Sequence, residues 1–300
     1  MEIGNKRITF VLNPASGTQS KEQVLDRIER SLDRRIYQPE VVFTDHVGHA
    51  TEISRQCAER GDYAVVAVGG DGTVNEVARA LIHTPTALGI IPCGSGNGLA
   101  RHLHIPINPT GAVDIINAGH VRTIDYGLLN DNPFFCTCGV GFDAFVSFKF
   151  AQAGRRGPLT YIEKALTEGL KYEPEEYEVE IDGMASTFRA FLIAVGNASQ
   201  YGNNAYITPH AALSDGLLDV TILLPFIPIE APALAVQLFT RRLDQNNCIR
   251  TYRGRNIIIR RKSGGVVHFD GEPSTMGEAL RIGVVRNGLR VISRRNQPTG

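Results

Sequence analysis

The stretch that decides the fold is "VAVGGDGTVNEVARAL" (residues 66–81). An apolar β-branched run stops at two glycines, an aspartate and a third glycine, and helical spacing follows. Val74, Val77 and Leu81 recur on one helical face, so the stretch predicts a buried strand that turns directly into an amphipathic helix. Glycine lets backbone N–H groups approach an anion, and the start of a helix is electropositive. The stretch therefore predicts an anion site with an acid, Asp71, beside it.

The same alternation of strand and helix runs through residues 1–125. Strands are predicted at 7–14, 40–45, 63–70 and 87–94, and further helices at 20–32, 49–61 and 109–120. Strands that are apolar throughout and separated by helices are typical of a parallel sheet covered on both faces. We therefore expect an α/β domain that binds its ligand at the carboxyl ends of the strands.

From residue 126 to 286 the pattern changes to short alternating runs joined by hairpin signals. This pattern predicts a mostly antiparallel β-sandwich, interrupted by helices at 157–172 and 228–243. A chain of 300 residues is long enough for two such domains.

Three predicted strands end in glycine-rich turns, "NPASG" (13–17), "GGDGT" (69–73) and "PCGSGNG" (92–98). Neither a P-loop signature nor a GxGxxG dinucleotide fingerprint is present in the sequence. A carboxylate beside phosphates repels them unless a divalent cation intervenes, so Asp71 favours a magnesium-assisted nucleoside triphosphate site. The alternative is that Asp71 caps its helix, although Thr73 could cap equally well.

Composition narrows the partners. Lys plus Arg (31) equals Asp plus Glu (31), which removes a bulk electrostatic case for nucleic acid. Five cysteines, two of them in "CTC" (136–138), match neither a disulfide framework nor a zinc-site spacing. No secretory segment and no apolar run of about 20 residues is seen, so we expect a cytoplasmic protein without a transmembrane segment.

An ordered set of motifs now resembles the diacylglycerol kinase catalytic-domain family, which includes bacterial lipid kinases and the sphingosine and ceramide kinases. The motifs extend along nearly the whole chain: "NPASG" (13–17), "TDHVGHA" (44–50), "GGDGTVNEV" (69–77), "GSGNGLAR" (94–101), "GVGFDA" (139–144), "GPLTY" (157–161), "DGLLDV" (215–220) and "FDGEP" (269–273). The resemblance implies a first domain like that of NAD kinases and phosphofructokinases, to which a last strand at about 287–300 returns. It also implies that the β-rich domain receives the lipid.

The resemblance implies a role for each matching residue. The residues that would line the ATP site are Asn13, Pro14, Ala15, Ser16, Gly17, Thr44, Gly69, Gly70, Asp71, Gly72, Thr73, Val74, Asn75, Gly94, Ser95 and Asn97. Asp71 would lie near Mg²⁺ and the phosphates, and Asp270 or Glu272 would be the general base. A structural magnesium would be held by Asp215 with main-chain oxygens of Ala212 and Leu217.

Two of the three Asp-Gly pairs in the β-rich half are also typical of hairpin turns. "HFDGEP" (268–273) is a hairpin signal, and a turn is a place from which a base can project. "EIDGMA" (180–185) carries the same signal, and we interpret it as a plain hairpin without a site.

Basic residues alternate with apolar ones at Arg155 and Arg156 and along 250–262. Such segments suit a peripheral enzyme that meets anionic lipid at the inner membrane face, although a solvated strand face explains them equally well. The oligomeric state, a homodimer included, stays open.

The sequence departs from the family pattern at Thr18 and Gly98, where many bacterial members carry a basic residue and an aspartate. "GSGN" is instead similar to the sphingosine and ceramide kinase branch, yet the acid that binds the sphingoid amine there aligns with Ser147. The sequence thus predicts an ATP- and magnesium-dependent lipid kinase acting on an acceptor such as diacylglycerol. The alternatives are a sphingoid base or ceramide kinase, a soluble NAD or sugar kinase, and an inactive nucleotide- or lipid-binding regulator.

Overall fold

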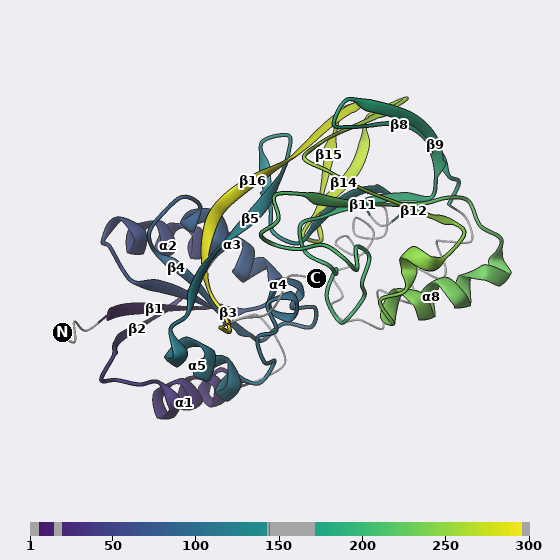
Figure 1. Ribbon diagram of the computed structural model, residues 1–300. Coiled ribbons are helices and arrows are strands. Elements are labelled where there is room, and N and C mark those ends of the chain that lie inside the picture. Colours follow the sequence, from purple (N-terminus) through teal and green to yellow (C-terminus); the bar gives the residue numbers. More distant parts are fainter. Residues whose placement is uncertain (1–5, 15–19, 143, 145–171, 296–300) are drawn as a thin grey trace. The chain divides into compact units, whose positions relative to one another are not determined.

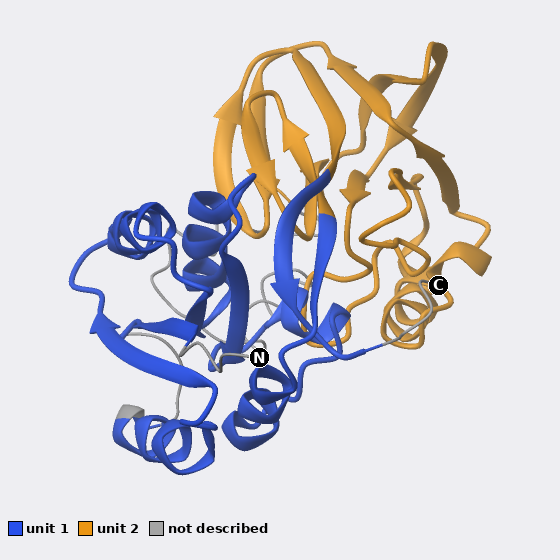
Figure 2. Ribbon diagram, turned by 60° about the vertical axis from the view of Figure 1, so that its left-hand side comes forward, with its two compact units in different colours: residues 1–124, 287–298 blue, residues 125–286, 299–300 orange. Residues whose placement is uncertain are grey.

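The structure is a computed structural model that describes residues 6–14, 20–142, 144 and 172–295. It forms two compact units, shown in different colours in Figure 2. Unit 1 comprises residues 1–124 and 287–298, and unit 2 comprises 125–286 and 299–300. Several predicted features lie outside the described residues, namely the helix at 157–172, Arg155, Arg156, Ser147 and the site residues Ala15, Ser16 and Gly17.

Unit 1 contains a parallel sheet with the strand order β2-β1-β3-β4. Helices α2 and α3 pack on one face of this sheet and α1 and α5 on the other (Figure 1). The elements of unit 1 are β1 (Lys6–Leu12), α1 (Lys21–Ser31), β2 (Tyr37–Phe43), α2 (His49–Glu59), β3 (Ala64–Gly69), α3 (Asp71–Leu81), β4 (Ala87–Pro92), α4 (Gly98–His102) and α5 (Pro109–Ala118).

The burial pattern explains the arrangement of these elements. Every residue of β3 and β4 is buried, as expected for strands covered on both faces. In α3, the buried side chains Val74, Val77 and Leu81 follow the helical spacing seen in the sequence. Ser20 is the N-cap residue of α1, although its side chain makes no capping hydrogen bond among the described residues.

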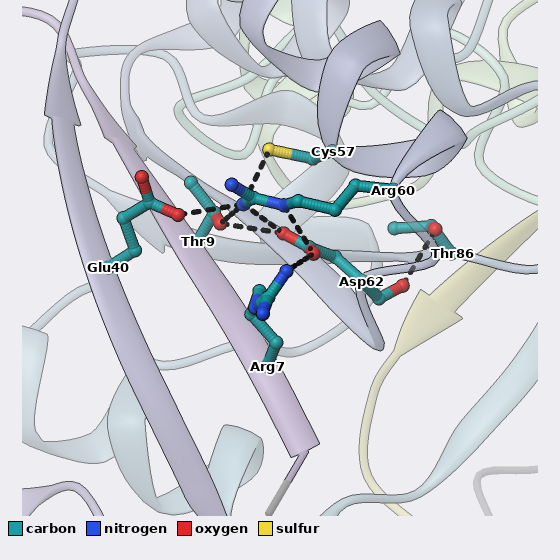
Figure 3. Close-up of polar contacts among 7 residues, drawn as sticks. All are labelled: Arg7, Thr9, Glu40, Cys57, Arg60, Asp62 and Thr86. Carbon is teal, nitrogen blue, oxygen red and sulfur yellow. Dashed lines mark hydrogen bonds and ion pairs between the residues drawn. The ribbon is translucent and has the colours of Figure 1, made fainter.

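A buried carboxylate ties the strands and α2 of unit 1 together (Figure 3). Asp62, which is 3% exposed and precedes β3, accepts hydrogen bonds from Thr9 in β1 and from Arg60 after α2, each at 2.8 Å. Arg60 also reaches Glu40 in β2 at 2.7 Å. Burial alone would raise the pKa of Asp62, but the donors Arg60 and Thr9 outweigh it and lower that pKa. Asp62 is therefore a charged anchor of the sheet.

Two long strands run from one unit into the other. In β16 (Ala279–Ile292), Val291 pairs in parallel with Leu88 of β4, whereas residues 279–283 pair antiparallel with β13. β5 (Val121–Leu129) pairs with β16 and crosses the unit boundary as well. The last strand of the chain thus completes the sheet of unit 1.

Unit 2 is built from two antiparallel arrays of strands. One has the order β12-β11-β10-β7-β14-β15, and the other contains β13, β8 and β9 next to β16. The bounds are β6 (Asn132–Phe134), β7 (Thr137–Gly141), β8 (Glu175–Ile181), β9 (Met184–Ala190), β10 (Leu192–Gly196), β11 (Leu218–Leu223), β12 (Ile249–Gly254), β13 (Asn256–Arg261), β14 (Gly265–Phe269) and β15 (Glu272–Met276).

The two arrays share one hydrophobic core. Val140, Val195 and Val220 from the first array are buried in the same cluster as Val179 and Ile259 from the second. Burying each such side chain contributes roughly 1.5–3 kcal/mol, so a common core favours face-to-face packing of the arrays. The predicted fold class, a parallel α/β domain followed by an antiparallel β domain, is confirmed.

The predicted helix at 228–243 is divided into three short elements. A 3₁₀ turn η1 (Pro228–Glu230) leads into α8 (Ala231–Phe239), and a second turn η2 (Leu243–Gln245) follows. Throughout the described part of the chain, helices fall short of the length and apolarity that crossing a bilayer requires.

Candidate active site

The start of α3 in unit 1 is open to a ligand. Its N-cap residue is Gly70, and no side chain caps the first turn. Gly72 in that turn is exposed, and no atom of the described residues lies within 4 Å of the position where its Cβ would be. The first backbone N–H groups of a helix lack partners within the helix, so this end offers N–H donors and a positive dipole to an anion.

Asp71 does not cap α3 but binds the neighbouring glycine-rich loop instead. One carboxylate oxygen accepts the N–H of Asn97 at 2.8 Å, and the other accepts the N–H of Gly98 at 2.7 Å. These residues are the N-cap and first residue of α4, so Asp71 stabilises the start of that helix. The alternative prediction that Asp71 caps its own helix, α3, was thus wrong, because the carboxylate binds the first N–H groups of α4 instead.

The electrostatics of Asp71 follow from these contacts. Desolvation raises the pKa of this half-buried carboxyl above its usual range, while the N–H groups of Gly98 and Asn97 and the charge of Arg101 act to lower it. Each oxygen of a carboxylate has two acceptor positions, and the two loop N–H groups occupy one on each. Asp71 therefore retains acceptor capacity that suits a hydrated Mg²⁺.

The loop of residues 94–98 is closed by Asn97, whose backbone is left-handed at φ 54°. Its side chain accepts the N–H of Gly94 at 3.1 Å and donates to the carbonyl of Gly94 at 2.7 Å. A Cβ on Gly94 would lie 2.6 Å from the Cα of Gly70. Gly94 is therefore required for the close approach of the two loops, and not only for the approach of an anion.

The remaining nucleotide-site candidates divide by burial. Thr73 and Val74 are buried, so their side chains pack inside unit 1, and only their backbone N–H groups remain for a phosphate. Asn75 is 4% exposed, and its side-chain Nδ2 has no hydrogen-bond partner among the described residues. A buried donor without an acceptor costs free energy, which a ligand oxygen could offset.

Backbone hydrogen bonds bring the ends of the strands together. The N–H of Asn13, after β1, donates to the carbonyl of Val68 at 3.3 Å, and the N–H of Cys93, after β4, donates to Gly69 at 2.8 Å. Thr44, which follows β2, is 8% exposed and donates its N–H to Leu12 at 3.0 Å. Pro14 is exposed beside Asn13, and Ser95 is exposed in the loop after β4. The described candidates in unit 1 thus lie at one edge of its sheet.

The hairpin "FDGEP" in unit 2 presents two acids in different environments. Asp270 is left-handed at φ 50° in a two-residue turn between β14 and β15. Its carboxylate accepts the N–H groups of Phe135 and Cys136, each at 2.7 Å, and of Thr137 at 3.0 Å. These three contacts hold the turn against the start of β7.

Glu272 is the first residue of β15, and its backbone is paired with Phe269. It is half-buried, and the turn places it directly after the residue that holds the hairpin in position. Of the two acids that the sequence proposes as the base, Asp270 holds the turn and Glu272 follows it, and which of them accepts a proton stays a prediction.

The proposed structural magnesium site is occupied by an ion pair in this geometry. Asp215 accepts the N–H of Leu217 at 3.0 Å and forms a salt bridge with Arg253, which also reaches Asp219 at 3.2 Å. Ala212 is buried in the preceding loop. A guanidinium on the single carboxylate does not fit a magnesium ion, so this site stays a prediction that requires Arg253 to move.

Sequence reasoning missed two residues that support these loops. Asp125 is 1% exposed in β5 and accepts the N–H of Gly216 at 2.8 Å, which anchors the loop that carries Asp215. Arg101 in α4 donates to the carbonyl of Gly96 at 3.0 Å and supports the loop of residues 94–98. An acid inside an apolar strand, as in "TIDYG", was the one available signal for Asp125.

Both halves of the chain match models of known protein families. Residues 7–129 match the diacylglycerol kinase catalytic domain, and residues 136–293 match the YegS C-terminal NAD kinase beta sandwich-like domain. A diacylglycerol kinase of Staphylococcus aureus (strain Newman) is 30% identical over 222 residues, covering 72% of this chain and 70% of that protein. An uncharacterized protein of Synechocystis sp. is 31% identical over 254 residues, and the match spans 79% of this chain but only 58% of that protein.

The fold comparison agrees. The crystal structure of a diacylglycerol kinase from Bacillus anthracis str. Sterne superposes with a TM-score of 0.74 at 20% identity, and the match covers 97% of both chains. At that identity the likeness establishes the fold, whereas the sequence matches along both units establish the family. The chain therefore belongs to the diacylglycerol kinase catalytic-domain family of lipid kinases.

Proposed function

We propose that this chain is an ATP-dependent lipid kinase that transfers the γ-phosphate of ATP to the hydroxyl of a lipid such as diacylglycerol, which gives phosphatidic acid. The observation that carries the proposal is the uncapped start of α3, where Asp71 holds the neighbouring glycine-rich loop by two backbone N–H groups. Membership of a kinase family implies ATP as the phosphoryl donor.

The donor half of the reaction belongs to unit 1. The N–H groups at the start of α3 and the unpartnered Nδ2 of Asn75 would bind phosphate oxygens. Mg²⁺, held through the remaining acceptor positions of Asp71, would neutralise charge on the triphosphate. Because phosphoryl transfer depends mainly on positioning and charge neutralisation, these groups would supply most of the catalysis.

The acceptor half belongs to unit 2. Glu272 would accept the proton of the lipid hydroxyl while the hydroxyl oxygen attacks the γ-phosphorus of ATP. The bond between the γ-phosphorus and the β–γ bridging oxygen would break, which releases ADP. Asp270 would act as a positioning residue, since its three N–H contacts hold the turn that carries Glu272. The substrate is then presented to the enzyme at a membrane surface, the inner face if the protein is cytoplasmic.

The test is to incubate the full-length protein with γ-labelled ATP, Mg²⁺ and mixed micelles that contain one acceptor at a time: diacylglycerol, sphingosine, ceramide or none. NAD and a hexose in solution are assayed in parallel. We expect label in phosphatidic acid and a loss of at least about 100-fold with Asp71→Ala.

If label appears in sphingosine phosphate or ceramide phosphate alone, the lipid kinase activity is supported and diacylglycerol is replaced as the acceptor. Label only in NAD or the hexose would refute a lipid acceptor. If the purified chain binds ATP but labels no acceptor, the proposal fails in favour of a regulator without kinase activity.

A further inference from the structure

Helix α8 of unit 2 is apolar on two opposite faces. Leu234 is buried in a cluster with Phe191 and Ile249, and Leu238, one turn later, is partly buried against the same cluster. The opposite face carries Val236 and Phe239, which are 62% and 46% exposed. A helix that is hydrophobic all round is normally covered on every side, by protein or by lipid.

Exposed apolar side chains also occur in the turn before the helix. Ile227 and Ile229 are 61% and 81% exposed. Together with Val236 and Phe239 they form the α8 patch, which holds four of the nine large hydrophobic side chains that are exposed among the described residues. Single exposed hydrophobic residues are common, but a concentration in one short segment marks an interaction site.

The exposed charged residues within 227–242 have one sign. The single acid of residues 227–242, Glu230, is half-buried and accepts the N–H of Ile227 at 2.9 Å. Arg241 and Arg242 follow the helix and are exposed. An apolar face flanked by cations, without an exposed carboxylate in residues 227–242, is complementary to an anionic bilayer.

We propose that the α8 patch docks unit 2 on an anionic lipid bilayer, with the side chains of the α8 patch buried at the level of the acyl chains and Arg242 at the headgroups. The inference rests on the proposed function, because a lipid acceptor has to be reached at a membrane. It adds the surface that would reach the membrane, and the residues of that surface include neither Glu272 nor any residue of α3.

The experiment is co-sedimentation of the full-length protein, without ATP, with vesicles of phosphatidylcholine alone or with about one third phosphatidylglycerol. We expect binding to the anionic vesicles and a loss of about tenfold or more in Val236→Asp/Phe239→Asp. Met184→Asp is the matched control, because Met184 is a 76% exposed apolar residue of the same unit, and its substitution should leave binding unchanged. Arg242→Ser should weaken binding to anionic vesicles about fivefold and leave binding to neutral vesicles unchanged.

Equal loss in Met184→Asp and in the α8 double variant, or no loss in either, would overturn the proposal. So would a wild-type dimer that the double variant converts to a monomer without a change in vesicle binding, since a second copy of the chain would then cover the α8 patch. Circular dichroism of each variant excludes unfolding as the cause.

Activity separates this proposal from the proposed function. With a short-chain diacylglycerol dissolved in buffer, the double variant should phosphorylate as the wild type does, and it should lose activity only on vesicles. If neither the wild type nor the double variant phosphorylates any lipid, and only the double variant fails to sediment with vesicles, the docking proposal is supported and the proposed kinase function is refuted.

Discussion

The two Asp-Gly hairpins of unit 2 have the same backbone and differ in what the turn holds. Asp182 and Gly183 have φ values of 47° and 89°, and Asp270 and Gly271 have 50° and 82°. In both hairpins the pair connects residues that face each other in the ladder. Each turn therefore has the two left-handed residues that a two-residue hairpin requires.

Both aspartates also accept N–H groups at the start of another strand, but the burial of the donors differs. Asp182 binds Arg255 at 3.1 Å and Asn256 at 2.9 Å, and both of these residues are exposed. Asp270 binds three residues that are at most 8% exposed.

The residue after each turn differs as well, since Met184 is largely exposed whereas Glu272 is a half-buried acid. In both hairpins the Asp-Gly turn thus holds the start of another strand, and in the proposed function the chemistry would come from the residue that follows the turn.

The largest effect is expected for the residue after the turn. Glu272→Gln removes the proposed proton acceptor at nearly constant shape and should lower kcat about 10²- to 10⁴-fold with little change in thermal stability. Met184→Gln at the matching position of the other hairpin is the control and should leave kcat unchanged. Steady-state kinetics with diacylglycerol in mixed micelles measures both, and a normal kcat in Glu272→Gln would remove Glu272 as the base.

The next effect concerns the clamps themselves. Asp270→Ala leaves buried N–H groups without an acceptor and should lower the free energy of unfolding by about 3 kcal/mol, whereas Asp182→Ala, whose donors water can reach, should cost about 1 kcal/mol or less. Urea unfolding of the two variants measures the difference. Equal losses would show that burial of the donors does not set the strength of the clamp.

The smallest effect is expected at the glycines. Gly271→Ala and Gly183→Ala each force a side chain into left-handed backbone where nothing else lies within 4 Å, so each should cost about 1 kcal/mol. Because the strain is local, the two losses should agree within error in thermal denaturation. A clearly larger loss at Gly271 would indicate that the "FDGEP" turn is under additional constraint.

Most of the fold could be predicted from the sequence, because its signals are local. The alternation of apolar strands with helices predicts a parallel sheet, and the glycines at 69–72 predict an uncapped helix start. Both signals lie within short stretches of the sequence. The helix at 228–243 was less predictable, since prolines and an all-round apolar face hide where one turn ends and the next begins.

By itself the sequence determined the two folds, the order of the motifs and the acids available for chemistry. Only the tertiary structure decided which of those acids keep acceptor positions for a ligand. The N–H groups that Asp71 accepts belong to residues that are 26 and 27 positions later in the sequence. Those that Asp270 accepts are 133 to 135 positions earlier, and Asp215 is paired with Arg253, 38 positions later. Partners that far along the chain are brought in by packing, and the contacts they make decide which oxygens of each carboxylate are already occupied.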